Sequence, residues 1–271
     1  MSLRIQNNVE AFNAHRQLTG TSAKLSKSME RLASGYRINR AADDSAGLAI
    51  SEKLRSQIGG LAQAQRNAQD AISLVQTAEG ALAEVHSMLG RIRDLAVQFL
   101  NGTLSAQDKA AITGEVAQLS AEISKIASDT KFNNVQLLNT TATVTFQIGA
   151  EDNQTLAVSR IDLVSASGVD PSIFASFAGG TVTLGSLDAA IANVASARST
   201  FGSVQNRLEH TLNNLATFEE NLQASESRVR DVDMAAEMVQ FTKLQILQQA
   251  GTSMLAQANI SPQSVLSLLR G

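Results

Sequence analysis

The sequence predicts a mainly α-helical fold, an elongated rod of long coiled-coil-like helices with one β-hairpin. Three features support this fold class. Two heptad series of apolar residues run through the chain. Proline occurs only twice in 271 residues, so few positions interrupt a helix. Apolar residues also recur at helical spacing close to both ends of the chain.

The first heptad series predicts one long helix from about Ala46 to Leu100. Its members, each seven residues apart, are Leu54, Leu61, Ala68, Val75, Leu82 and Leu89. Such a helix extends roughly 80 Å at 1.5 Å per residue, whereas a compact globule of this size is about 50 Å wide. We therefore expect a rod. Asp43, Asp44 and Ser45 precede the series and can cap the helix.

The other helices are predicted from similar signals. The second heptad series is Phe201, Leu208, Leu215, Leu222 and Val229. A shorter helix has apolar residues at Ile112, Val116, Leu119, Ile123 and Ile126. Ser105 and Asp108 resemble a capping box before that helix. Ser186 stands before a helical segment that starts at Leu187, and Ser261–Pro262 has the pattern of a cap followed by the first residue of a last helix.

The middle of the chain has a different pattern. Val144, Phe146 and Ile148 alternate with polar residues, a turn-like stretch follows at 149–153, and Leu156 and Val158 alternate after it. This pattern predicts one β-hairpin at about 142–164. Residues 165–185 are rich in serine and glycine and are predicted to form a short surface loop.

Apolar stripes mark both terminal helices. The N-terminal stripe is Ile5, Val9, Phe12, Leu18, Leu25, Met29 and Leu32; the C-terminal stripe is Met234, Met238, Phe241, Leu244, Leu247, Leu255, Val265, Leu266, Leu268 and Leu269. Burying seven such side chains is worth roughly 10–20 kcal/mol, as much as the stability of a whole domain. The two ends are therefore expected to pair with each other or to be buried in neighbouring subunits. A self-contained helical bundle is the alternative. A membrane-surface helix is disfavoured because the polar residues include few lysines and arginines.

Composition excludes several classes of function. The net charge is −3 and no basic block is present, which argues against a nucleic-acid partner. The chain lacks cysteine and has no apolar run long enough to span a membrane, and we expect no cleaved signal peptide. His15, His86 and His210 are far apart in sequence, and the chain contains no phosphate-binding loop or nucleophile elbow. We therefore expect no catalytic residue, no cofactor and no metal.

Both ends of the chain resemble bacterial flagellin. The resemblance is carried by residues 31–39 (RLASGYRIN), 42–50 (ADDSAGLAI), 246–259 (ILQQAGTSMLAQAN) and 265–270 (VLSLLR). It covers about 1–164 and 186–271 and leaves room for only a short loop where many flagellins carry outer domains. The resemblance implies an extracellular filament subunit for motility, a homopolymer that is exported by the flagellar type III apparatus.

The resemblance also implies a domain division and partners. Residues 1–42 and 234–271 would form an inner-core helical domain that mediates polymerisation. Because the apolar stripes lack partners in a single chain, we expect this domain to be largely disordered in the monomer. Residues 43–233 form the outer-core rod. An export chaperone binds the C-terminal helix, and filament cap and junction proteins meet the assembled chain. The polymerisation seam comprises Ile5, Val9, Phe12, Leu18, Leu25, Met29, Leu32, Met238, Phe241, Leu244, Leu247, Leu255, Leu266 and Leu269.

A receptor surface is implied as well. Some flagellins are recognised by a Toll-like innate receptor, and the matching segment here is 90–98 (GRIRDLAVQ) with Glu115. Arg91, Leu95 and Glu115 are the candidates. Gly90 and Asp94 depart from the usual glutamine and glutamate, and the same residues can serve subunit packing.

Three other functions are alternatives. A hook–filament junction protein shares similar terminal helices. A non-polymerising helical translocator or adhesin would remain a stable monomer at high concentration. An enzyme within a flagellin frame would need a catalytic insert, and residues 165–185 have neither the length nor the histidines for one.

Overall fold

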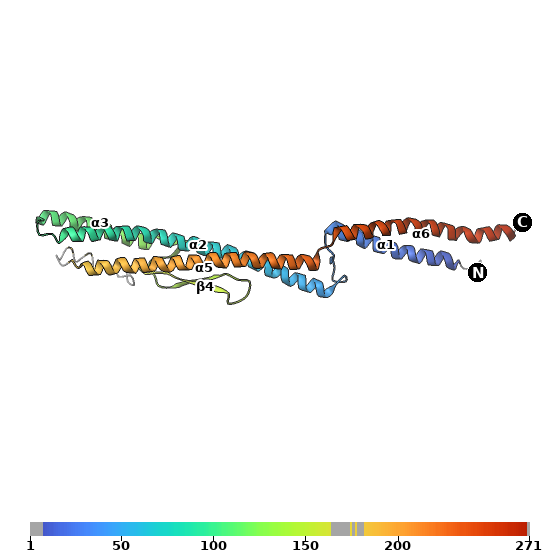
Figure 1. The fold of residues 1–271 in the computed structure, drawn as a ribbon, viewed down its shortest axis with the longest axis horizontal. Coiled ribbons are helices and arrows are strands. Elements are labelled where there is room, and N and C mark those ends of the chain that lie inside the picture. The colour runs from blue at the N-terminus through green and yellow to red at the C-terminus, as the bar shows by residue number, and fades with distance from the viewer. Residues whose placement is uncertain (1–7, 164–173, 175–176, 178–181, 270–271) are drawn as a thin grey trace. The chain divides into compact units, whose positions relative to one another are not determined.

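The computed structural model describes residues 8–163, 174, 177 and 182–269, with side chains described as far as Ile260. Contacts divide the chain into two compact units. Unit 1 comprises Met1–Ser56 and Leu222–Gly271, and unit 2 comprises Gln57–Asn221. The fold is mainly α-helical, as predicted (Figure 1).

Long helices make up most of the described chain. They are α1 (Val9–Ser34), α2 (Ser45–Phe99), α3 (Ala106–Asp129), α5 (Leu184–Arg230) and α6 (Met234–Leu269). The predicted long helix agrees with α2 to within one residue at each end. Within the described ranges no helix has the length and apolarity that crossing a membrane requires.

Unit 2 has an apolar core between α2, α3 and α5. Buried core residues on the three helices include Val75, Leu82, Leu89, Ile92, Val116, Ile123, Leu187, Val194, Phe201 and Leu208. Polar pairs flank this core: Gln65 Nε2 donates to Glu219 at 2.6 Å, and Arg93 pairs with Asp188 at 2.6 Å. These pairs show that α2 and α5 run antiparallel. The heptad series therefore predicted the correct buried faces.

The predicted hairpin is confirmed. Strands β3 (Thr143–Gln147) and β4 (Thr155–Ser159) pair antiparallel, with Thr143 opposite Ser159 and Gln147 opposite Thr155. Leu156 and Val158 are buried in the core, while the alternate residues are exposed. The turn lies close to α2, because a Cβ built on Gly60 would be 3.0 Å from the Cβ of Ala150. Gly60 thus permits close packing of the hairpin.

A smaller hairpin was not predicted. Strands β1 (Lys131–Phe132) and β2 (Val135–Gln136) flank a two-residue turn. Asn133 and Asn134 have φ of 46° and 67°, the pair of left-handed conformations that a tight type I′ turn requires. Each strand has only two residues, too few for alternation to be recognised in the sequence.

Two of the predicted helix caps are present at the helix N-termini, and one predicted helix start is wrong. Asp44 Oδ1 accepts from Gly47 N at 2.8 Å, and Ser105 and Asp108 form the predicted capping box. The start before Leu187 was wrong: α5 begins at Leu184, so Ser186 lies in its first turn, where its hydroxyl donates to the Thr183 carbonyl at 2.8 Å. Most of the predicted 165–185 loop lies outside the described residues.

The separate last helix at Ser261–Pro262 was also wrong, because α6 continues through both residues. Proline lacks the N–H that would bond to the carbonyl four residues earlier, which is that of Ala258. Asn8, the N-cap residue of α1, donates from Nδ2 to the Ala258 carbonyl at 2.8 Å and satisfies it. This contact removes part of the cost of an internal proline.

Candidate assembly surface

The composition of α6 is unusual for a surface helix. Glu237 and Lys243 are the only charged residues in its 36 positions. A helix that is apolar on most of its circumference is normally buried on most sides. Among the helices that the structure describes in unit 1, however, α1 is the one that packs along α6 (Figure 1).

The two terminal helices form an antiparallel pair. Asn8 contacts Ala258, Leu18 lies over Gly251, and Ser28 donates to Glu237 at 2.5 Å. The less exposed positions repeat at steps of three and four: residues 11, 14, 18, 21, 25, 28 and 32 of α1 and residues 237, 241, 244, 248, 251, 255 and 258 of α6. This repeat is a coiled-coil seam, which we call the paired face.

The predicted seam residues divide between this paired face and the rest of the surface. Leu18, Leu25, Leu32, Phe241, Leu244 and Leu255 lie on the paired face, where Leu244 is buried and the others are half-buried. Val9, Phe12, Met29, Met238 and Leu247 are exposed. Ile5 and the side chains of Leu266 and Leu269 lie outside the described residues.

Further large apolar side chains are exposed on the same two helices. With the five exposed seam residues, these are Met234, Val239, Ile246, Met254 and Ile260. Phe12 is 72% exposed, Val239 71% and Ile246 61%. Met238, Val239, Thr242, Lys243, Ile246 and Leu247 line a shallow depression on α6. We call all these exposed apolar residues of α1 and α6 the unpaired faces.

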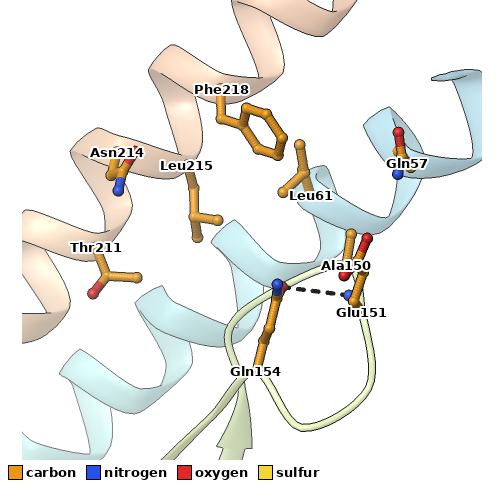
Figure 2. A pocket seen from close by; sticks show the side chains of 9 residues that line it. All are labelled: Gln57, Leu61, Ala150, Glu151, Gln154, Thr211, Asn214, Leu215 and Phe218. Carbon is orange, nitrogen blue, oxygen red and sulfur yellow. Dashed lines mark hydrogen bonds between the residues drawn. The ribbon is translucent and has the colours of Figure 1, made fainter.

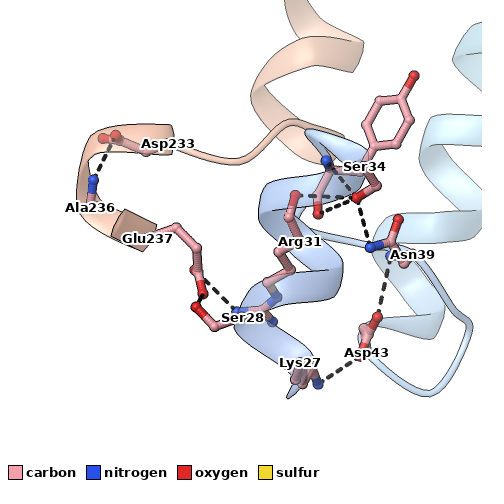
Figure 3. A network of polar contacts seen from close by, with 10 residues as sticks. Lys27, Ser28, Arg31, Ser34, Asn39, Asp43, Asp233, Ala236 and Glu237 are labelled. Carbon is pink, nitrogen blue, oxygen red and sulfur yellow. Dashed lines mark hydrogen bonds and ion pairs between the residues drawn. The ribbon is translucent and has the colours of Figure 1, made fainter. Parts of the chain in front are cut away.

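A polar network holds the neighbouring part of unit 1 together (Figure 3). Lys27 Nζ lies 2.6 Å from Asp43, whose other oxygen accepts from the backbone N–H groups of Arg40 and Asn39. The Lys27 bond, and then the Arg40 bond, lower the pKa of Asp43 from 3.8 to about 2. Asp43 therefore fixes the segment after α1 in a charge-dependent way.

Glu237 plays a similar role at the start of α6. Its carboxylate accepts from the buried Ser28 hydroxyl and lies 3.6 Å from Arg31 (Figure 3). Asp233 caps α6 by accepting from Ala235 N and Ala236 N at 3.0 and 3.1 Å. Glu237, one of the two charged residues of α6, thus fixes the register between α1 and α6.

Two connecting segments of unit 1 also pair, which the sequence reasoning missed. Tyr36 and Asp231 form an isolated antiparallel bridge, with Arg37 N donating to the Arg230 carbonyl at 2.7 Å. The Arg230 guanidinium lies 4.7 Å from the Tyr36 ring centroid and also pairs with Glu52 at 2.8 Å.

The receptor candidates occupy two different environments in unit 2. Arg91 and Glu115 pair at 2.8 Å between α2 and α3, with side chains 57% and 44% exposed. Leu95 is only 2% exposed and belongs to the core. The ion pair of Arg91 and Glu115 is therefore accessible to a partner, whereas Leu95 packs in the core beneath this surface.

A separate cavity of about 340 Å³ lies in unit 2 (Figure 2). Leu61, Leu215 and Phe218 supply apolar walls, and Glu151 and Gln154 come from the hairpin turn. The lining contains no nucleophile beside a base. Across the described residues, no cluster of histidine and carboxylate side chains could hold a metal ion.

Known proteins resemble this chain over almost its whole length. Residues 5–143 match the model of the bacterial flagellin N-terminal helical region, and 184–269 match the C-terminal helical region. A flagellin of Halalkalibacterium halodurans is 50% identical over 270 residues, covering 98% of this chain and 99% of that protein. A Bacillus subtilis flagellin is 46% identical over 306 residues, covering 99% and 100%. A structure described as a flagellar hook-associated protein of Vibrio parahaemolyticus shares the fold, with a TM-score of 0.60 at 16% identity over 70% of this chain and all of that one.

Proposed function

The chain belongs to the bacterial flagellin family, and we propose that it assembles into a filament by burying the unpaired faces of α1 and α6 in neighbouring copies. Flagellins are structural proteins of the extracellular flagellar filament, not enzymes. The observation that carries the proposal is a nearly uncharged α6 whose described residues, as far as Ile260, pack on α1 along one side and leave large apolar residues exposed. Contacts that repeat from copy to copy without closing a ring produce a helical polymer.

Burial of the unpaired faces would release enough free energy to offset the cost of association. Fully burying an apolar side chain is worth about 1.5–3 kcal/mol, so burying the half-exposed residues of the unpaired faces yields on the order of 10 kcal/mol per copy. Association costs roughly 4–15 kcal/mol in lost freedom and ordering. The balance is close, so assembly should depend steeply on concentration and on salts that strengthen apolar burial.

We also propose that residues 1–42 and 234–271 are ordered only on assembly. The paired face includes Thr21, Ser28, Gln248 and Gly251, which contribute little apolar burial. A two-helix pair of this composition is marginal by itself. Hydrogen exchange should therefore be fast in these segments of dilute monomer and slow in the polymer. Strong protection in dilute monomer would refute this proposal.

Electron microscopy of the purified full chain, before and after salting-out, tests the assembly proposal. Filaments built from this chain alone are the expected result. A stable monomer at high concentration would instead favour a non-polymerising translocator or adhesin. Scarcity of the chain in sheared filaments would favour a hook–filament junction protein, since the hook-associated structure shares this fold.

The unpaired faces also need cover before assembly. We infer that a flagellar export chaperone binds α6 while the chain awaits the type III export apparatus, and that cap and junction proteins meet the polymer. Calorimetry with the chaperone should show tight binding to the full chain. Replacing Leu247 with aspartate should weaken that binding, because it places a charge on the surface concerned. Unchanged binding would place the chaperone elsewhere.

Recognition by a Toll-like receptor is proposed from the exposed pair of Arg91 and Glu115. Receptor signalling should fall when Arg91 is replaced by alanine. Arg198→Ala is the matched control, because Arg198 lies outside residues 90–98, is partly exposed and also pairs with a carboxylate, Glu79 at 3.6 Å. Equal signalling by the two variants would remove the proposal.

A further inference from the structure

The methionines of this chain are concentrated on the proposed assembly surface. Of the six methionines, Met1 lies outside the described residues and Met88 is half-buried in unit 2. The others all lie on α1 and α6: Met29 is 51% exposed, Met234 49%, Met238 50% and Met254 65%. The chain has no cysteine, so thioethers are its only sulfur groups.

We propose that Met29, Met234, Met238 and Met254 are separate oxidation sites for peroxide-class oxidants, and that their conversion to sulfoxides blocks assembly of the free subunit. The inference rests on the proposed function, because it requires that copies pack through these faces. In the reaction, a sulfur lone pair attacks one oxygen of hydrogen peroxide and the O–O bond breaks. The sulfur gains that oxygen with its hydrogen, and the departing hydroxide takes up this proton, which leaves the sulfoxide and one water.

The surroundings of Met238 explain why oxidation should be disruptive. Its neighbours Val239, Ile246 and Leu247 are apolar, and the Thr242 hydroxyl already donates to the Met238 carbonyl at 2.8 Å. A sulfoxide oxygen is a strong acceptor. Buried at a contact between copies, it would find few donors and would oppose association.

Assembly should in turn protect these residues. In the free chain these four residues are about half exposed or more, whereas in the proposed polymer the same faces are covered. Oxidation should therefore be several-fold slower in filaments than in free subunits at Met29, Met234, Met238 and Met254. Met88 provides an internal reference, because its burial within unit 2 does not require assembly.

The test treats purified full-length chain with hydrogen peroxide, as free subunit and as filament. Peptide mass spectrometry measures oxidation at each methionine, and sedimentation measures the concentration of chain left unpolymerised. We expect that concentration to rise at least roughly tenfold after oxidation of the free subunit. Methionine sulfoxide reductases acting on both epimers should restore assembly.

Two variants complete the experiment. Replacing all four residues with leucine conserves volume and should give a chain that polymerises and resists peroxide. Met88→Leu, the matched control, should polymerise and remain sensitive. Unchanged assembly of fully oxidised chain, or no recovery with the reductases, would overturn the inference even if the leucine variant fails to fold. Failure of untreated chain to polymerise would instead overturn the proposed function, and this inference with it.

Discussion

The core of unit 2 and the terminal helix pair of unit 1 both use a heptad repeat, with different results. In α2 the inward positions Leu61, Ala68, Val75, Leu82 and Leu89 are at most 2% exposed. In α1 and α6 the paired face contains serine, threonine, glutamine and glycine, while large apolar residues remain exposed elsewhere. The first repeat is satisfied within one chain. The second leaves apolar surface that further copies can cover.

A charge placed on the unpaired faces should have the largest effect on assembly. Ile246→Asp should abolish filament formation, because burying an unpaired carboxylate between copies costs several kcal/mol. The circular dichroism of unit 2 should not change. Ala157→Asp, on the exposed face of β4, should still assemble. Normal filaments of Ile246→Asp by electron microscopy would contradict the assignment of this surface.

The second prediction compares two leucine truncations in dilute monomer. Leu82→Ala should lower the free energy of unfolding by about 2–5 kcal/mol, because it creates a cavity in the core of unit 2. Leu247→Ala should have little effect there, since Leu247 is 46% exposed. Urea denaturation measures both. Similar losses for the two variants would show that unit 1 and unit 2 are stabilised alike within one chain.

The same contrast explains what the sequence could predict. The spacing of apolar residues predicted the long helices and the hairpin. Each of these elements buries one face, and that face sets the spacing. The division of the terminal stripes into a paired face and unpaired faces could not be predicted. Because α6 is apolar on most sides, its periodicity does not identify the side that packs on α1. The bridge between Tyr36 and Asp231 joins residues far apart in sequence, and no local signal specifies such a contact.

The continuity of α6 was missed for a related reason. Pro262 favours a helix start when only its neighbours are considered. The donor that satisfies the Ala258 carbonyl is Asn8, which is 250 residues away. Local propensity was outweighed by a contact that only the folded pair provides.

A third prediction uses this contact. Asn8 has two roles: its Oδ1 accepts from Ala11 N at 3.0 Å, and its Nδ2 donates to the Ala258 carbonyl. Asn8→Asp keeps the capping oxygen and removes the donor, so filament stability should fall by about 0.5–1.5 kcal/mol. Asn8→Ala should cost more, because it removes the cap as well. Thermal depolymerisation measures both, and wild-type stability of Asn8→Asp would remove the role assigned to Nδ2.

The fourth prediction concerns pH. The pKa of Asp43 is lowered from 3.8 to about 2 in the folded chain, so its ionised form is favoured by folding. Its contribution is present above pH 3.8 and is lost as the pH falls from there through about 2. Asp43→Asn should destabilise filaments at pH 7, and the difference from wild type should vanish at the acid end of that range. A difference that is independent of pH would exclude the charge as its cause.

The smallest expected effect lies in unit 2, at the turn between β1 and β2. Asn134 has φ of 67°, a conformation that glycine adopts without the strain of a Cβ. Asn134→Gly should therefore stabilise dilute monomer by less than about 1 kcal/mol, because relief of strain slightly exceeds the added entropy of the unfolded chain. Asn139→Gly is the control: φ at Asn139 is not positive, so the entropy term alone remains and stability should fall. Both changes should leave the concentration needed for assembly unchanged, since unit 2 folds without help from neighbouring copies. A shift in that concentration would show that the core of unit 2 also responds to assembly. The heptad repeat of unit 2 would then not be satisfied within one chain.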